Sequence, residues 1–186
     1  MKNYLSDYVK LYPGTVSADL CRRTLEELTL AGEWEKHEWM AYANDNAHSL
    51  NGDNEPGATG YVTETNSEII ESLRDALTNY VIDVDCSWFG SWQGYSAPKY
   101  LRYEVGDLMS KHHDHIYELY EPGAPVLSII GSLSSDYEGG ELVLFDDTRY
   151  RLGEGDVIIF PSNFLYPHQV YPVTKGVRHS FVSWSN

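Results

Sequence analysis

The second half of the chain contains the run PVLSIIGSL at residues 125–133 and, further along, the run DVIIF at residues 156–160. Short runs of apolar and β-branched residues bounded by Gly, Asp and Pro are typical of buried β-strands. Comparable runs recur from about Tyr95 onward, at residues 99–103, 111–116, 125–133, 141–145, 148–152, 156–160, 168–173 and 176–184. Eight short strands in series predict a double-sheet jelly roll (double-stranded β-helix), because face-to-face packing removes exposed sheet edges.

The first half of the chain predicts two helices that support one of these sheets. Apolar residues recur at helical spacing between residues 20 and 28, with Ser17 as a candidate N-cap and Gly32 as a candidate end. A second stripe runs over residues 69–80. Residues 65–68, which precede it, match a capping box. The alternative is that Ser67 alone caps the helix. The predicted class is therefore mainly β with flanking N-terminal helices (α+β).

Between the two helices, residues 44–60 are rich in Asn, Asp, Gly and Ala, which predicts a mobile surface loop. Two interpretations of this loop and its neighbouring tryptophans stay open. They either form a lid or substrate groove, or they are a spacer loop and packing aromatics. The tryptophans concerned are Trp34, Trp39, Trp88 and Trp92.

Length and composition limit the class of protein. A chain of 186 residues predicts a single domain, with residues 1–95 as helical support and residues 96–186 as the jelly-roll core. The 13 basic and 28 acidic residues give a net charge of −15, which makes nucleic acid an unlikely partner. Cys21 and Cys86 are too few for a disulfide scaffold. With no leader-like or membrane-spanning apolar run, we expect a cytoplasmic protein that does not contact a membrane.

Histidines cluster in the β half of the chain, in the segment KHHDH at residues 111–115 and again at His168. Strand alternation places His112 and Asp114 on one face and His113 and His115 on the other. If His168 joins His112 and Asp114, the result is a two-histidine, one-carboxylate triad, which suits Fe(II) and leaves coordination positions open. A His-x-Asp triplet alone is a weak signal.

Arg178 strengthens this interpretation. It follows His168 by ten residues, across a predicted turn at residues 174–176 that would join two strands into a hairpin. Even spacing keeps both side chains on one face, on the order of 10 Å apart along the strands. A small dicarboxylate would span that distance, with one end on the metal and the other held by the guanidinium.

Several ordered motifs resemble those of the prolyl 4-hydroxylase-like branch of the 2-oxoglutarate- and Fe(II)-dependent dioxygenases. The run YEVGDLMSKHHD at residues 103–114 is similar to the segment that carries the first two iron ligands in that family. The run DYEGGEL at residues 136–142 and the run GDVIIFPS at residues 155–162 are similar to the hairpin and the strand before the distal histidine. The run HQVYPVTKGVRHS at residues 168–180 is similar to the terminal signature. The resemblance covers roughly residues 99–184.

The resemblance implies a role for individual residues. By this likeness His112, Asp114 and His168 bind iron, and Arg178 holds the distal carboxylate of 2-oxoglutarate. A smaller set of residues is implied around the cosubstrate and the substrate. Tyr103 and Ser128 are expected to contact 2-oxoglutarate, and Trp184 and Met109 to lie near the substrate, where Met109 stands in place of a tyrosine usual in peptide-prolyl hydroxylases.

The resemblance also implies an activity. The expected enzyme is a dioxygenase that uses Fe(II), O2 and 2-oxoglutarate, hydroxylates a peptide or small-molecule substrate, and releases succinate and CO2. Ascorbate binding, with rescue of uncoupled turnover, is expected by the same analogy. His113, His115 and His179 receive no ligand role by this likeness.

Two alternatives remain. A one-residue shift in strand register would give a cupin-like metal protein that uses His113 and His115 with His168 and needs no 2-oxoglutarate. The jelly roll also serves non-enzymatic binding modules.

Overall fold

A computed structural model of the chain describes residues 4–37, 39–43, 46–50, 54–85, 94–115, 125–145 and 147–186, with backbone only for residues 39–43 and 46–50. The helices are a 3-10 turn at Leu5–Tyr8, α1 at Ala18–Ala31 and α2 at Asn66–Val84. The strands are β1 (Lys10–Tyr12), β2 (Glu35–Lys36), β3 (Trp39–Ala43), β4 (Asn46–Leu50), β5 (Gly57–Thr59), β6 (Lys99–Tyr103), β7 (Met109–His112), β8 (Leu127–Ser132), β9 (Glu138–Gly139), β10 (Leu142–Leu144), β11 (Thr148–Tyr150), β12 (Val157–Pro161), β13 (His168–Val170), β14 (Val173–Lys175) and β15 (Arg178–Ser185).

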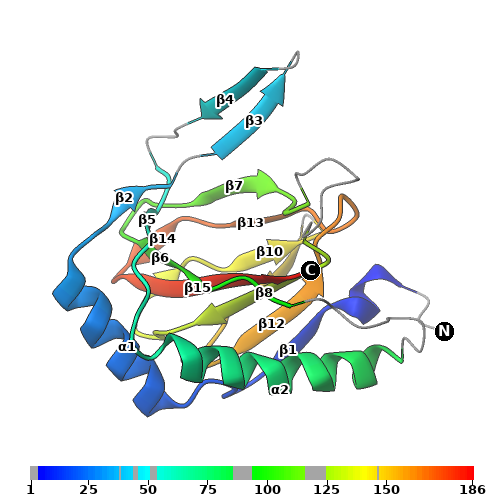
Figure 1. Ribbon diagram of the computed structural model, residues 1–186. Coiled ribbons are helices and arrows are strands. Elements are labelled where there is room, and N and C mark those ends of the chain that lie inside the picture. Colours follow the sequence, from blue (N-terminus) through cyan, green and yellow to red (C-terminus); the bar gives the residue numbers. More distant parts are fainter. Residues whose placement is uncertain are drawn as a thin grey trace.

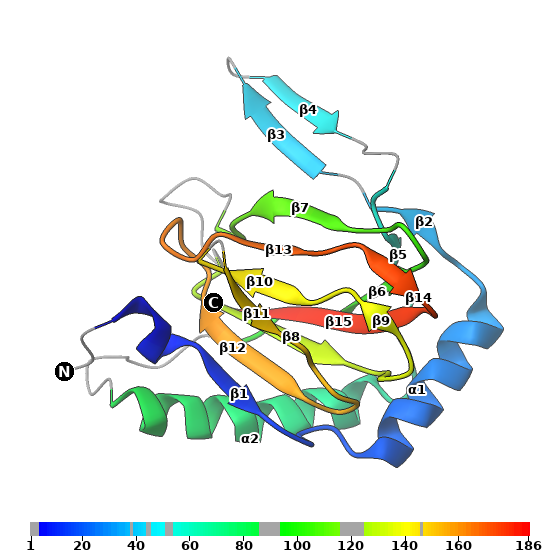
Figure 2. The ribbon, with the colours of Figure 1, turned by 180° about the vertical axis from the view of Figure 1, so that it is seen from behind.

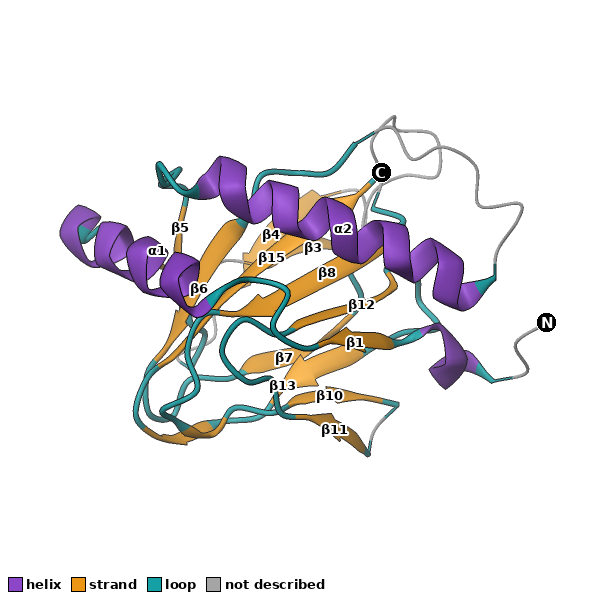
Figure 3. Cartoon of the chain, turned by 90° about the horizontal axis from the view of Figure 1, so that it is seen from below, coloured by secondary structure: helices purple, strands orange, loops and turns teal. Residues whose placement is uncertain are grey.

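Two antiparallel sheets form the body of the protein (Figure 1). The larger sheet has the strand order β1-β12-β8-β15-β6-β5-β2, and the smaller has the order β11-β10-β13-β7. From behind, the smaller sheet and the β9–β14 pair lie in front of the larger sheet (Figure 2). Helices α1 and α2 cover the opposite face of the larger sheet (Figure 3). The predicted jelly roll with supporting helices is confirmed.

Strand β12 shows how the sequence builds both layers. Val157 and Ile159 belong to the core between the larger sheet and the helices, whereas Ile158 and Phe160 belong to the core between the two sheets. All four side chains are fully buried. A central strand that is covered on both faces needs apolar residues at every position, which explains the uninterrupted run at residues 157–160.

The end signals of α1 are confirmed and those of α2 are not. Ser17 Oγ accepts a hydrogen bond from the backbone N–H of Leu20, and Gly32 ends the helix at φ 64°. Thr65 is the N-cap of α2, but its side chain makes no capping hydrogen bond. Its hydroxyl lies 2.8 Å from that of Thr24, so the predicted capping box is wrong. Among the described residues, neither helix combines the length and the apolarity that a bilayer crossing requires.

The prediction of a loop over residues 44–60 is also wrong. Strands β3 and β4 pair as a hairpin that projects beyond the end of the sheets (Figure 1), and β5 extends the larger sheet beside β6. Polar composition did not exclude strands here, because a projecting ribbon and an edge strand need not bury a whole face. Trp34 packs against Arg102, while Trp88, Trp92, Cys86 and the side chain of Trp39 lie outside the described residues.

The predicted hairpin between His168 and Arg178 does not form. Strand β13 pairs with β10 and β7 in the smaller sheet, whereas β15 pairs with β6 and β8 in the larger sheet. The predicted strand over residues 168–173 is interrupted at Pro172, which has no backbone N–H for a ladder, and β14 pairs instead with β9. His168 and Arg178 therefore reach the interior from opposite sheets.

Candidate metal centre

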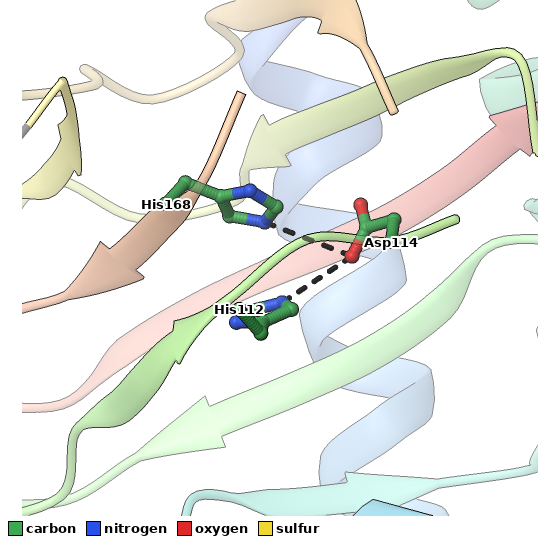
Figure 4. A group of neighbouring side chains, drawn as sticks. All are labelled: His112, Asp114 and His168. Carbon is green, nitrogen blue, oxygen red and sulfur yellow. Dashed lines mark ion pairs between the residues drawn. The ribbon is translucent and has the colours of Figure 1, made fainter. Parts of the chain in front are cut away.

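Three potential metal ligands converge at the end of the smaller sheet. His112 is the last residue of β7 and pairs with His168, the first residue of β13. Asp114 Oδ1 lies 3.2 Å from His112 Nε2 and 3.7 Å from His168 Nε2 (Figure 4). The three ligand atoms lie within 4.8 Å of one another. Strand β7 ends before Asp114, so the predicted strand over residues 111–116 is too long, and the bend after His112 brings the carboxylate to the site.

The backbone orients both imidazoles toward this point. His112 Nδ1 lies 2.7 Å from the carbonyl oxygen of Ser110, and His168 Nδ1 lies 3.2 Å from that of Tyr166. A carbonyl can only accept, so each Nδ1 carries the proton and each Nε2 is left with its lone pair facing the site. Burial lowers the pKa of His168 to about 4, which keeps this imidazole neutral at physiological pH.

The carboxylate of Asp114 is buried and held by hydroxyl groups. Ser128 Oγ donates to Asp114 Oδ2 at 2.6 Å, and the Ser162 and Ser128 hydroxyls lie 2.9 Å apart. Burial alone would raise the pKa of Asp114, but the adjacent His112 and His168 rings and the hydrogen bond from Ser128 hold it well below its usual range.

The donor set fits a divalent transition metal. Two imidazole lone pairs and an ionised carboxylate face one another, which is unfavourable without a positive charge between them. Two nitrogens and one oxygen on one side of a site form the facial arrangement typical of non-haem Fe(II), which leaves positions for further ligands. Among the described residues, His113 and His115 do not join His168 in such a cluster, and His115 Nδ1 instead contacts the carbonyl of Pro125 at 3.0 Å. The cupin-like register is therefore not the one the structure adopts.

A cavity of about 320 Å³ extends from the triad between the two sheets. Its walls combine apolar side chains of both sheets with a small set of polar groups. Of the residues expected around the site, it is lined by His112, Asp114, His168, Arg178, Tyr103, Met109 and Trp184. Ser128, expected to face 2-oxoglutarate, is not among the lining residues, and its hydroxyl donates to Asp114.

Arg178 is a buried cation at the other end of this cavity. Its side chain is 1% exposed, and its guanidinium lies 4.7 Å from the centre of the Tyr103 ring. It donates from Nη1 to Ser180 Oγ at 2.8 Å, while Nε has no acceptor among the residues that the structure describes. Burial raises the pKa of Tyr103 to about 12, so its hydroxyl remains a potential donor. No carboxylate of the described segments forms an ion pair with Arg178, and a buried guanidinium of this kind is typical of a site that binds an anion.

Three polar groups around the site, Ser162, Ser180 and Lys99, were not predicted from the sequence. Ser162 extends the hydrogen bonds behind Asp114, and Ser180 accepts from Arg178. The position of Ser180 two residues after Arg178 on one strand was a usable signal, because side chains at i and i+2 share a face. Lys99 also lines the cavity, at a position that strand alternation places on the same face as Tyr103.

Comparison with known proteins agrees with this geometry. The family model described as "2OG-Fe(II) oxygenase superfamily" matches residues 98–186. A PKHD-type hydroxylase of Idiomarina loihiensis is 40% identical over 88 residues, which cover 45% of this chain and 38% of that protein. A PKHD-type hydroxylase of Aliarcobacter butzleri is 33% identical over 139 residues, which cover 65% of this chain and 60% of that protein. The matched segments therefore span less than two thirds of the length of these relatives.

Solved structures share the fold over almost the whole chain. A Pseudomonas putida prolyl-4-hydroxylase matches with a TM-score of 0.67 at 16% identity, covering 96% of this chain and 91% of that one. A Trichoplax adhaerens prolyl hydroxylase, solved with a peptide fragment of hypoxia inducible factor, matches with a TM-score of 0.70 at 15% identity, covering 97% and 84%. At such identities the likeness concerns the fold. Residues 98–186, which contain the triad and Arg178, are therefore similar to the 2OG-Fe(II) oxygenase superfamily in sequence, and the chain is similar to prolyl hydroxylases in fold.

Proposed function

We propose that the protein is a 2-oxoglutarate-dependent dioxygenase that hydroxylates a C–H bond of a peptide or a small molecule. The observation that carries the proposal is the pairing, within one cavity, of a two-histidine, one-carboxylate cluster with a buried arginine that has no carboxylate partner in the described part of the chain. Fe(II) and O2 supply the oxidising chemistry, which couples decarboxylation of 2-oxoglutarate to succinate and CO2 with hydroxylation of the substrate.

The residues of the chain bind and orient the reactants. His112, Asp114 and His168 would hold the iron from one side, leaving its remaining positions directed into the cavity. Arg178 would grip the distal carboxylate of 2-oxoglutarate through charge-assisted hydrogen bonds, with its guanidinium positioned by Ser180. The Tyr103 hydroxyl, which stays protonated, would donate to the same molecule.

The cavity wall has a separate task, which is to exclude water from the oxidising centre. Leu101, Ile130 and Leu142 contribute apolar surface from both sheets. Met109 and Trp184 also line the cavity, and we assign them to the substrate side. In this proposal the helices of the first half support the larger sheet, so that residues 1–186 form one catalytic unit. Ascorbate would restore the enzyme after turnover that is not coupled to substrate.

Anaerobic titration with Fe(II) and 2-oxoglutarate tests the proposal directly. We expect a metal-to-ligand charge-transfer absorption, because the 2-oxo acid chelates the iron, and succinate on admission of O2. Arg178→Ala should raise the 2-oxoglutarate concentration needed for half-maximal absorption by about 10- to 100-fold, as expected for loss of a charge-assisted hydrogen-bond pair. Absence of the absorption in the wild-type protein, with Fe(II) bound, would favour a non-enzymatic binding module.

A further inference from the structure

A second cation, Lys99, lines the cavity that also contains Arg178. Lys99 is the first residue of β6, and alternation along that strand places it on the cavity face with Leu101 and Tyr103. It pairs across the sheet with Val182, which also lines the cavity. The side chain is half-buried, and this burial lowers the pKa of Lys99. The ammonium is therefore partly desolvated where a bound molecule can reach it.

No described residue neutralises this ammonium. The chain carries 28 acidic residues against 13 basic ones, and other lysines do find carboxylates: Lys36 lies 3.2 Å from Asp107, and Lys175 lies 2.8 Å from Glu138. Across the described ranges, Lys99 has neither an ion pair nor a hydrogen bond from its side chain. Among the described residues that line the cavity, the one carboxylate belongs to Asp114, which already contacts Ser128 and the two histidines.

The strand register places the two cations at different ends of the cavity. Arg178 lies opposite Tyr103, whereas Lys99 lies four residues along β6, about 13 Å away at 3.3 Å per residue. Moving in the same direction along β15, Trp184 pairs with Ser128, the residue that holds Asp114. Lys99 is therefore on the metal side of the cavity and Arg178 on the far side. A dicarboxylate that extends from the metal to Arg178 leaves Lys99 without a counter-charge.

A second unmet donor lies at the same end. Trp184 lines the cavity, and its Nε1–H has no acceptor among the residues that the structure describes. The Lys99 ammonium and the Trp184 indole N–H are both donors, and each calls for an acceptor. The cavity volume of about 320 Å³, shared with the cosubstrate, suits a small group rather than a bulky one.

We propose that Lys99 recognises a carboxylate of the primary substrate, so that the oxidised C–H bond belongs to a molecule, or a residue, that carries a carboxylate close by. This inference rests on the proposed function and adds the substrate's chemical class to it. The carboxylate belongs either to a free α-amino acid or to an acidic side chain of a peptide. The chemistry of recognition is the same for both, and experiment distinguishes them.

Binding is measured by calorimetry on the anaerobic complex of the protein with Fe(II) and 2-oxoglutarate. One arm compares free L-α-amino acids with the corresponding amino-acid amides. A second arm compares acetylated, amidated peptides that contain Asp or Glu with their Asn or Gln counterparts. We expect at least one carboxylate to bind about tenfold or more tightly than its amide in the wild-type protein. The arm in which this preference occurs identifies the source of the carboxylate.

Three variants complete the test. Lys99→Met should abolish the preference for carboxylate over amide, Lys99→Arg should retain most of it, and Lys10→Met, a charge removal on β1 outside the cavity, should leave it unchanged. The affinity for 2-oxoglutarate, followed by the charge-transfer absorption, should be the same in all three. Equal binding of carboxylates and amides by the wild type would overturn the inference, as would weaker 2-oxoglutarate binding in Lys99→Met. Failure of the proposed function appears differently, as loss of the charge-transfer absorption in the wild type.

Discussion

Removing the Ser128 hydroxyl provides a quantitative test of how the candidate metal centre is held. Ser128→Ala deletes the 2.6 Å hydrogen bond to Asp114 Oδ2, in a place where the serine is fully buried and water cannot replace it. A hydrogen bond to a charged group contributes about 1.5–3 kcal/mol, and each 1.4 kcal/mol is a factor of ten in affinity. We therefore expect metal binding to weaken by about 10- to 100-fold, in the range found for groups that orient metal ligands.

The assay is equilibrium competition for Co(II) between the protein and a chelator of known affinity, which needs neither 2-oxoglutarate nor turnover. Ser132→Ala is the matched control, because Ser132 lies on the same strand, is equally buried and donates one hydrogen bond, to the carbonyl of Ser134 at 2.8 Å. It should reduce the free energy of unfolding without changing metal affinity. Wild-type affinity in Ser128→Ala, or an equal loss in Ser132→Ala, would refute the argument that this hydroxyl positions the carboxylate.

Three further expectations concern the metal and the core. Saturating Co(II) at about 100 times its dissociation constant should stabilise the wild type by about 2.7 kcal/mol, and thermal melting should show no such gain in His168→Ala, which lacks one ligand. Gly131→Ala places a methyl group 2.0 Å from Cζ of the buried Phe181, so chemical denaturation should show a loss of about 1–3 kcal/mol from overpacking; an unchanged midpoint would contradict it. Burial raises the pKa of Cys21 to about 12, so this thiol stays protonated at pH 8, and mass spectrometry should find it alkylated by iodoacetamide only after denaturant is added.

The sequence predicted best the strands that are buried on both faces and the helix whose apolar residues recur at a regular spacing. The run at residues 156–160 indicated a strand because a central strand covered on both faces has no polar positions. The α1 helix was bounded correctly because Ser17 and Gly32 act through local backbone geometry. Strand pairing, in contrast, depends on residues that are distant in the sequence. The β3–β4 hairpin and the edge strand β5 carry no strong apolar pattern, so their composition suggested a loop.

The sequence predicted which residues come together more accurately than it predicted how the fold brings them together. His112, Asp114 and His168 do converge, but through a chain bend after β7 rather than through alternation along one strand. Arg178 does share their cavity, but from the facing sheet rather than from a common hairpin. Ser128 was expected near the cosubstrate, and the structure adds a hydrogen bond to Asp114, which could not be read from the spacing of residues along the sheet.

The two histidines of the triad are aimed by main-chain carbonyls two positions before them, those of Ser110 and Tyr166. A peptide oxygen is present whatever residue occupies the position, so this steering survives almost any replacement there apart from those that distort the strand. The main chain therefore sets the orientation of the two imidazoles. The orientation of the Asp114 carboxylate depends instead on the Ser128 hydroxyl, which a single substitution removes. Random substitutions in the residues around the triad therefore threaten the position of Asp114 more than the orientation of His112 and His168.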